Sequence, residues 1–146
     1  MSKREAFSGD VTLHIRDNCL CLHVQRTARI LAQRFDDALR PLGLTSGQFS
    51  LLTSLNRPEP PGIGRIANVL AMDRTTLTAN LKPLERRKLV KIVPDKNDKR
   101  NRLLHLTKAG HRLLEEALPI WRETHSAMEK RITSADRLRA DLKALA

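Results

Sequence analysis

The chain has 146 residues, enough for one domain with a buried core, and its formal net charge is +11. Three Phe, one Trp and no Tyr are too few aromatic side chains for binding single strands by base stacking. No apolar run is long enough to span a membrane, and the first residues do not form a signal peptide. Two cysteines cannot form a disulfide framework. We therefore expect a cytoplasmic protein that binds no membrane and no cofactor.

The positive charge is concentrated in the middle of the chain. Residues 57–108 hold +8, from 13 lysines and arginines against five acidic residues, whereas residues 1–56 hold +2 and residues 109–146 hold +1. A compact cationic module suits a polyanion, because each Lys or Arg that neutralises a phosphate releases a counterion. The alternative is a basic interaction module whose solvated face binds acidic proteins or membrane surfaces.

The first expected element is one long helix over residues 11–39. Apolar residues recur along it at steps of three and four and form one stripe: Leu20, Val24, Ala28, Leu31, Phe35 and Leu39. Pro41 and Gly43 then stop the helix. Because a small domain cannot cover a helix of this length, the pattern favours packing against a second chain.

A second helix is expected from residue 46, because Thr45 followed three residues later by Gln48 is a capping-box pattern. Its inner face would consist of Phe49, Leu52 and Leu55. The segment 57–62 is a loop, since prolines at this density cannot stay helical.

A short third helix is expected over residues 63–70, and Asp73 is placed to cap a fourth helix over residues 74–87. Pro83 predicts a kink or a break in this helix. The fourth helix buries the stripe Leu77, Leu81 and Leu84. At 100° per residue, the opposite face carries Thr75, Ala79, Lys82 and Arg86, with Thr76 and Thr78 on its flanks. Hydroxyl groups followed by cations fit the major groove of DNA, although an ordinary solvated surface has the same composition.

Two β-type runs, residues 89–93 and 102–106, flank the cationic segment 94–101 and predict a hairpin with a basic tip. Thr107 is placed to cap a fifth helix, and a short last helix is expected from Thr133 or Ser134 to Leu145. Two closely spaced helices followed by such a hairpin form the order of a winged helix-turn-helix. The expected fold is therefore mostly α with a small β-hairpin wing.

At this point the chain resembles the MarR-type transcriptional regulators, from about residue 15 to residue 130. The segments that carry the resemblance are residues 42–49 (LGLTSGQF), 73–78 (DRTTLT), 84–90 (LERRKLV), 98–100 (DKR) and 106–110 (LTKAG). The resemblance implies a homodimer in which the first and the last two helices of two chains intertwine. Residues 11–42 and 107–146 would then form a helical dimerisation region, and residues 43–106 the winged helix-turn-helix domain that binds DNA.

The candidate DNA-binding residues are Arg74, Thr75, Thr76, Thr78, Lys82, Arg86, Lys99 and Arg100. In the family the Asp and Arg of the Asp-Lys-Arg segment support each other, which implies that Asp98 orients the wing. The chain departs from the family where many members have Arg instead of Ala79 and Gly instead of Lys88. One DNA contact is then missing, and Lys88 has to accept a strained left-handed conformation or end the helix differently.

Two sensing alternatives concern the first helix. Cys19 and Cys21 are candidate redox sensors, because some family members respond to oxidants through a cysteine near this helix. Two positions apart on one helix, they point about 200° apart and cannot easily bridge each other, and the alternative is a pair of buried, apolar-like residues. Zinc sensing would use Cys19 and His23 with His14 nearby, but a closed zinc site needs four ligands, so we assign no metal site.

The expected function is sequence-specific regulation of transcription by a homodimeric, ligand-responsive repressor that binds a pseudo-palindromic operator. Its partners would be double-stranded DNA, a second copy of the chain and a small-molecule effector between the first, second and fifth helices. The sequence contains no phosphate-binding glycine loop, no metalloprotease histidine pair and no nucleophile elbow, so we expect no enzyme activity.

Overall fold

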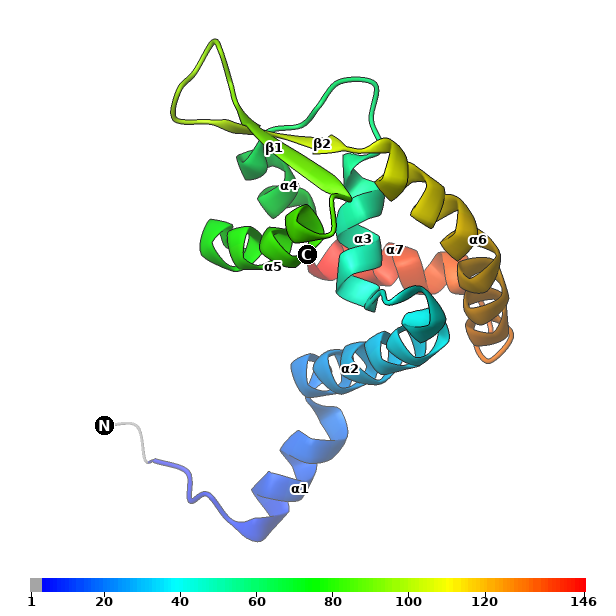
Figure 1. The fold of residues 1–146 in the computed structure, drawn as a ribbon. Coiled ribbons are helices and arrows are strands. Elements are labelled where there is room, and N and C mark those ends of the chain that lie inside the picture. Colours follow the sequence, from blue (N-terminus) through cyan, green and yellow to red (C-terminus); the bar gives the residue numbers. More distant parts are fainter. Residues whose placement is uncertain (1–3) are drawn as a thin grey trace.

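The computed structural model describes residues 4–146, which are mainly helical (Figure 1). In chain order the elements are α1 (Gly9–Asn18), α2 (Leu20–Leu39), the 3-10 helix η1 (Arg40–Leu42), α3 (Ser46–Leu55), α4 (Ile63–Val69), α5 (Arg74–Arg86), β1 (Val90–Pro94), β2 (Arg102–Leu106), α6 (Lys108–Glu129) and α7 (Ala135–Leu145). The predicted fold class, helices with a small hairpin wing, is confirmed. Within these residues, no helix combines the length and the apolar character that crossing a bilayer requires.

Two helices, α1 and α2, span residues 9–39, so the prediction of one helix over residues 11–39 is wrong. The break is at Cys19, whose φ of −69° and ψ of 111° are those of extended backbone. Just before it, the Asn18 side chain donates to the carbonyl oxygen of His14 at 2.8 Å. An asparagine that bonds the backbone in this way competes with the helical hydrogen bonds. The apolar periodicity did not reveal the break, because the stripe from Leu20 to Leu39 lies entirely after Cys19.

Side-chain caps mark the starts of α1, α3, α5, α6 and α7, whereas α4 begins after Gly62 without one. Thr45 accepts the backbone N–H of Gln48, and the Gln48 side chain accepts the N–H of Thr45, so the predicted capping box is confirmed. Thr107 and Ser134 cap α6 and α7 with their side-chain oxygens, which accept the backbone N–H of Gly110 and of Arg137. Pro83 lies inside α5 without ending it, since the leucines on both sides of it are fully buried and offset the lost hydrogen bond.

The predicted hairpin is also confirmed. β1 and β2 are antiparallel, with Val90 opposite Leu106 and Pro94 opposite Arg102. An isolated bridge between Gly62 and Leu103 joins the loop that follows α3 to this sheet. The hairpin is therefore joined to the helices by this bridge as well as by its own connections to α5 and α6.

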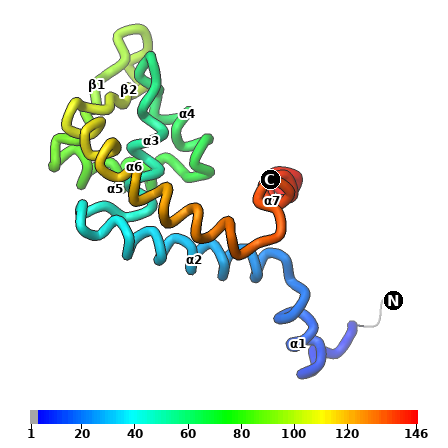
Figure 2. The backbone as a smooth tube through the Cα atoms, turned by 90° about the vertical axis from the view of Figure 1, so that its right-hand side faces the viewer, coloured from blue at the N-terminus to red at the C-terminus, as the bar shows by residue number. Residues whose placement is uncertain are grey.

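The core lies mainly between α3, α4, α5 and the hairpin. Its largest fully buried side chains are Leu39, Leu51, Leu52, Ile66, Leu77, Leu81, Leu84 and Leu104. α6 runs beside α2 and adds the buried Ala117, whereas α1 and α7 contain no buried residue. Figure 2 shows both of these helices set apart from the body of the molecule. Their apolar side chains are therefore left to pack against something other than this core.

Candidate nucleic-acid interface

The start of α5 is fixed by Asp73. Its carboxylate accepts the backbone N–H of Thr76 at 2.8 Å and the Thr76 hydroxyl at 2.9 Å. These bonds, the backbone bond first, stabilise the charged form and lower the pKa of the Asp73 carboxyl. Asp73 is therefore the N-cap that the sequence predicts. The Thr76 hydroxyl, which the sequence placed beside the groove-facing surface, is bonded within this cap.

α5 has a buried and an exposed face. The side chains of Leu77, Leu81 and Leu84 are 0% exposed. The remaining candidate residues of the helix are all exposed: Arg74, Thr75, Thr78, Lys82 and Arg86. The predicted separation of buried and exposed faces on α5 is thus confirmed. The leucines pack the helix against the core, and its cations and hydroxyl groups face outward.

Two of these exposed side chains, those of Arg74 and Thr78, also contact neighbouring residues of the chain. Arg74 lies over α4, so close to Gly64 that a Cβ atom on that glycine would be 2.6 Å from Nη2 of Arg74. Thr78 donates its hydroxyl proton to the carbonyl oxygen of Arg74 at 2.8 Å. Glycine at position 64 therefore leaves the space in which the guanidinium of Arg74 rests.

The loop between β1 and β2 carries the second group of candidate residues. Asp95 accepts the side-chain amide of Asn101 at 3.2 Å, which ties the two ends of the loop together. Asp98 accepts the backbone N–H of Arg100 at 3.0 Å. The support that the resemblance implied between Asp98 and Arg100 thus runs through the backbone of Arg100. The side chains of Lys99 and Arg100 are exposed.

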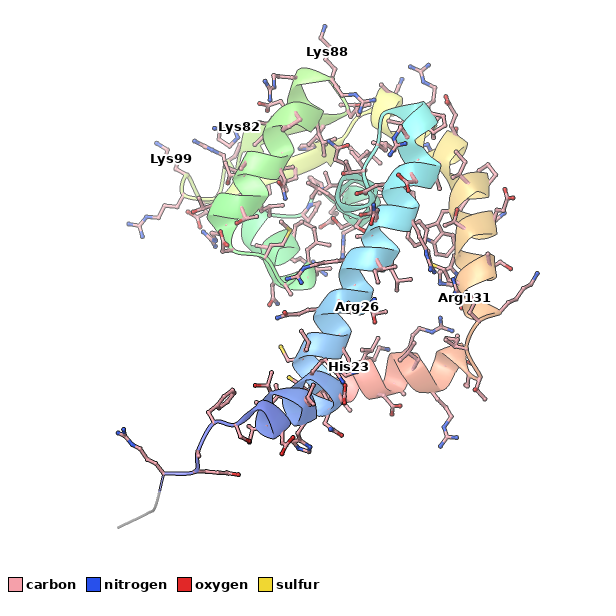
Figure 3. All side chains as sticks on the ribbon, turned by 90° about the horizontal axis from the view of Figure 1, so that it is seen from below. His23, Arg26, Lys82, Lys88, Lys99 and Arg131 are labelled. Carbon is pink, nitrogen blue, oxygen red and sulfur yellow. The ribbon has the colours of Figure 1, made fainter. Side chains whose placement is uncertain are left out.

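The structure brings the helix and the wing tip to one side of the molecule. Figure 3 shows Lys82 and Lys99 extending from the same side, whereas Arg131, in the turn after α6, lies on the other side. We call this surface the cationic face, and it consists of Arg74, Thr75, Thr78, Lys82, Arg86, Lys99 and Arg100. A duplex lying along it could take α5 in its major groove and the wing tip on its backbone or minor groove.

Sequence reasoning missed the contact that fixes the far end of α5. Arg87 donates from Nη1 to the carbonyl oxygen of Gly43 at 2.6 Å and from Nη2 to that of Leu42 at 3.3 Å. These carbonyl groups end η1, where a helix terminus favours a cation. Arg87 therefore joins α5 to the segment that follows α2. No local pattern signals a contact between residues 44 positions apart.

Lys88 ends α5 in the strained conformation. Its φ is +59°. The N–H of Lys88 bonds the carbonyl oxygen of Glu85 at 2.9 Å and the N–H of Leu89 bonds that of Leu84 at 3.0 Å, which together form a Schellman motif. Of the two expected outcomes, acceptance of the strain is the one observed.

The two cysteines do not share one helix, contrary to the expectation of a continuous first helix. Cys19 is the extended residue between α1 and α2 and is half-buried, whereas Cys21 lies in the first turn of α2 and is exposed. Within a single chain neither cysteine is fully buried. The His23 ring lies with Nδ1 2.8 Å from the Cys19 carbonyl oxygen. Across residues 4–146, no three His, Cys, Asp or Glu side chains are grouped to hold a metal ion.

Among known protein families, residues 44–101 match the MarR family. Transcriptional activatory protein BadR of Rhodopseudomonas palustris is 33% identical over 101 residues, which cover 67% of this chain and 58% of BadR. HTH-type transcriptional repressor NicR of Pseudomonas putida is 32% identical over 80 residues, which cover 55% of this chain and 51% of NicR. The chain thus spans little more than half the length of these relatives. The crystal structure of the M. tuberculosis transcriptional regulator MosR in complex with DNA matches with a TM-score of 0.81 at 34% identity, over 88% of this chain and 93% of MosR.

Proposed function

This chain belongs to the MarR family of transcriptional regulators, and from that premise we propose that it is a homodimer that binds double-stranded DNA sequence-specifically. The observation that carries the proposal is the cationic face, in which an exposed helix held by fully buried leucines and a basic wing tip lie on one side. The similar MosR was crystallised with DNA. We assign the chain a regulatory and not an enzymatic role, and place it in the cytoplasm.

In this proposal each part of the cationic face meets a different part of the duplex. α5 enters the major groove, with Thr75, Thr78 and Lys82 nearest the base edges and Arg74 and Arg86 toward phosphates. Lys99 and Arg100 reach the flanking backbone or minor groove. Thr76 acts through the Asp73 cap that orients the helix, and Asp98 acts through the backbone of the wing tip.

The homodimer is supported by apolar side chains that a single chain leaves in water. They lie on α1, the first turns of α2, and α7: Leu13, Ile15, Leu20, Leu22, Val24, Leu138, Leu142 and Leu145. A groove of about 470 Å³ runs between α2, the end of α6 and α7. Packing against a second copy would bury these groups. We therefore assign dimerisation to residues 11–42 and 107–146 and DNA binding to residues 43–106.

We place the effector in a cleft of about 100 Å³ between α2, α3 and α6, lined by Phe35, Ser46, Phe49, Ser50 and Trp121. Trp121 stacks on His125 with ring centroids 4.6 Å apart. The cleft lies between the proposed dimerisation region and the proposed DNA-binding region. An aromatic ligand that widens it would therefore favour a different distance between the α5 helices of the two chains. Release of the operator would follow, so that the chain acts as a repressor, as NicR does by name.

Selection of bound duplexes from a random pool tests the proposal. We expect one pseudo-palindromic sequence with half-sites about one helical turn apart. Arg100→Ala should then weaken binding and reduce the slope of log K against log salt by about one unit for each lost phosphate contact. Arg112→Ala, on an exposed position of α6, is the matched control and should bind as the wild type does. A pool with no enriched sequence, or equal affinity for anionic vesicles, would contradict DNA recognition.

A further inference from the structure

The exposed face of α5 contains a shallow hollow of about 350 Å³. Five residues of this one helix line it: Arg74, Thr75, Thr78, Ala79 and Lys82. Along the helix, Arg74 and Lys82 stand at its two ends, and Ala79 lies between them, one turn after Thr75. The floor of the hollow is thus made by the smallest side chains, and its ends are cationic. Figure 3 shows Lys82 extending outward from this helix.

The floor presents mainly methyl groups. The Thr78 hydroxyl is turned onto its own helix, where it donates to the carbonyl oxygen of Arg74 at 2.8 Å. The methyl group of Thr78 is therefore left to face outward beside the Cβ methyl of Ala79. The Thr76 hydroxyl is likewise bonded to Asp73 at 2.9 Å. Of the two threonines that line the hollow, Thr78 thus uses its hydroxyl proton within the protein, whereas Thr76 lies outside the hollow.

A methyl-lined floor selects among the groups that bases expose in the major groove. Guanine and adenine present nitrogen and oxygen acceptors or an amino group, cytosine presents an amino group, and thymine adds a methyl group at C5. The part of the floor made by Ala79 and the methyl group of Thr78 cannot satisfy a donor or an acceptor, and covering one with it leaves that group unpaired. The thymine methyl is the base substituent that gains by leaving water here.

We propose that Ala79 is a specificity-determining residue, which selects a thymine in each half-site by packing against its 5-methyl group. The inference rests on the proposed function and adds to it the base that the middle of α5 reads. Arg74, at one end of the hollow, holds a flanking phosphate, and Lys82, at the other end, contacts a neighbouring base edge, so that together they keep the floor over that base pair. Burial of one methyl group corresponds to about a fourfold change in affinity.

Replacing thymine by uracil tests this, because the exchange removes only the 5-methyl group. In the selected operator, each thymine is replaced in turn and binding is measured with the wild type and with Ala79→Gly. We expect one position per half-site at which uracil weakens wild-type binding about fourfold, and at which Ala79→Gly shows no further loss. Thymines elsewhere in the same duplex are the internal control.

Asn80→Gly is the matched protein control, since it introduces the same helix-weakening residue next to the hollow without lining it. This variant should keep the full sensitivity to uracil. If Ala79→Gly folds poorly, Ala79→Ser replaces it and should also reduce the sensitivity. Uracil tolerated at every position, or an equal loss in wild type and Ala79→Gly, would overturn the inference while leaving DNA binding intact. A wild-type chain that binds no duplex would overturn both.

Discussion

Gly110 gives the sharpest test of the packing between α6 and the hairpin. It is buried in the first turn of α6, and a Cβ atom at this position would lie 2.4 Å from the carbonyl oxygen of Leu89 and 2.7 Å from Cδ1 of Leu106. The Leu89 oxygen cannot easily move away, because it accepts the Thr107 backbone N–H at 3.1 Å and the Thr107 hydroxyl at 3.0 Å. Helix propensity alone predicts that Gly110→Ala stabilises the protein by about 1 kcal/mol.

The structure predicts the opposite sign. Overlap with a fixed backbone atom costs about 3 kcal/mol, at the upper end for overpacked sites, so that Gly110→Ala should lower the free energy of unfolding by about 2 kcal/mol after the propensity gain. Urea unfolding followed by far-UV circular dichroism measures this, at one protein concentration because dimer dissociation contributes to the transition.

Gly47→Ala is the control for this measurement. Gly47 also lies in a first helical turn, but the nearest atom to its added Cβ is Oγ1 of Thr45 at 3.9 Å, an ordinary contact. It should therefore raise stability by about 0.5 kcal/mol. If Gly110→Ala proved as stable as the wild type while Gly47→Ala gained stability, the close approach of α6 to Leu89 would be refuted.

Three further changes test the ends of α5. Lys88→Gly should stabilise the protein by about 0.5–1 kcal/mol in urea unfolding, because glycine relieves the left-handed strain, and a loss of stability would contradict the Schellman geometry. Asp73→Asn should lower the melting temperature at pH 7 but much less at pH 3. Because folding lowers the pKa of Asp73, its carboxylate stabilises the folded chain above the unfolded-state pKa, and this stabilisation is lost as pH falls through the folded-state pKa. An equal drop in melting temperature at both pH values would argue against the charged cap. Arg87→Met should cost about 1–2 kcal/mol in urea unfolding, whereas Arg112→Met should cost nothing, and equal effects would show that the contact with η1 is unimportant.

The sequence by itself determined the elements whose signals are local. Capping is decided within four residues, so Thr45 with Gln48, and Asp73, mark helix starts in the sequence alone. The helical period likewise separated the leucines of α5 from Lys82 and the threonines, because 100° per residue fixes which side chains share a face. The hairpin followed from two β-type runs around a polar segment. These features gave the fold class and the exposed candidate residues of α5.

Only the tertiary structure decided how these elements meet. The bonds of Arg87 to Gly43 join residues 44 positions apart, and the approach of Gly110 to Leu89 depends on the angle at which α6 leaves the hairpin. Such contacts depend on how buried side chains fit together in the core, and spacing along the chain carries no record of that fit.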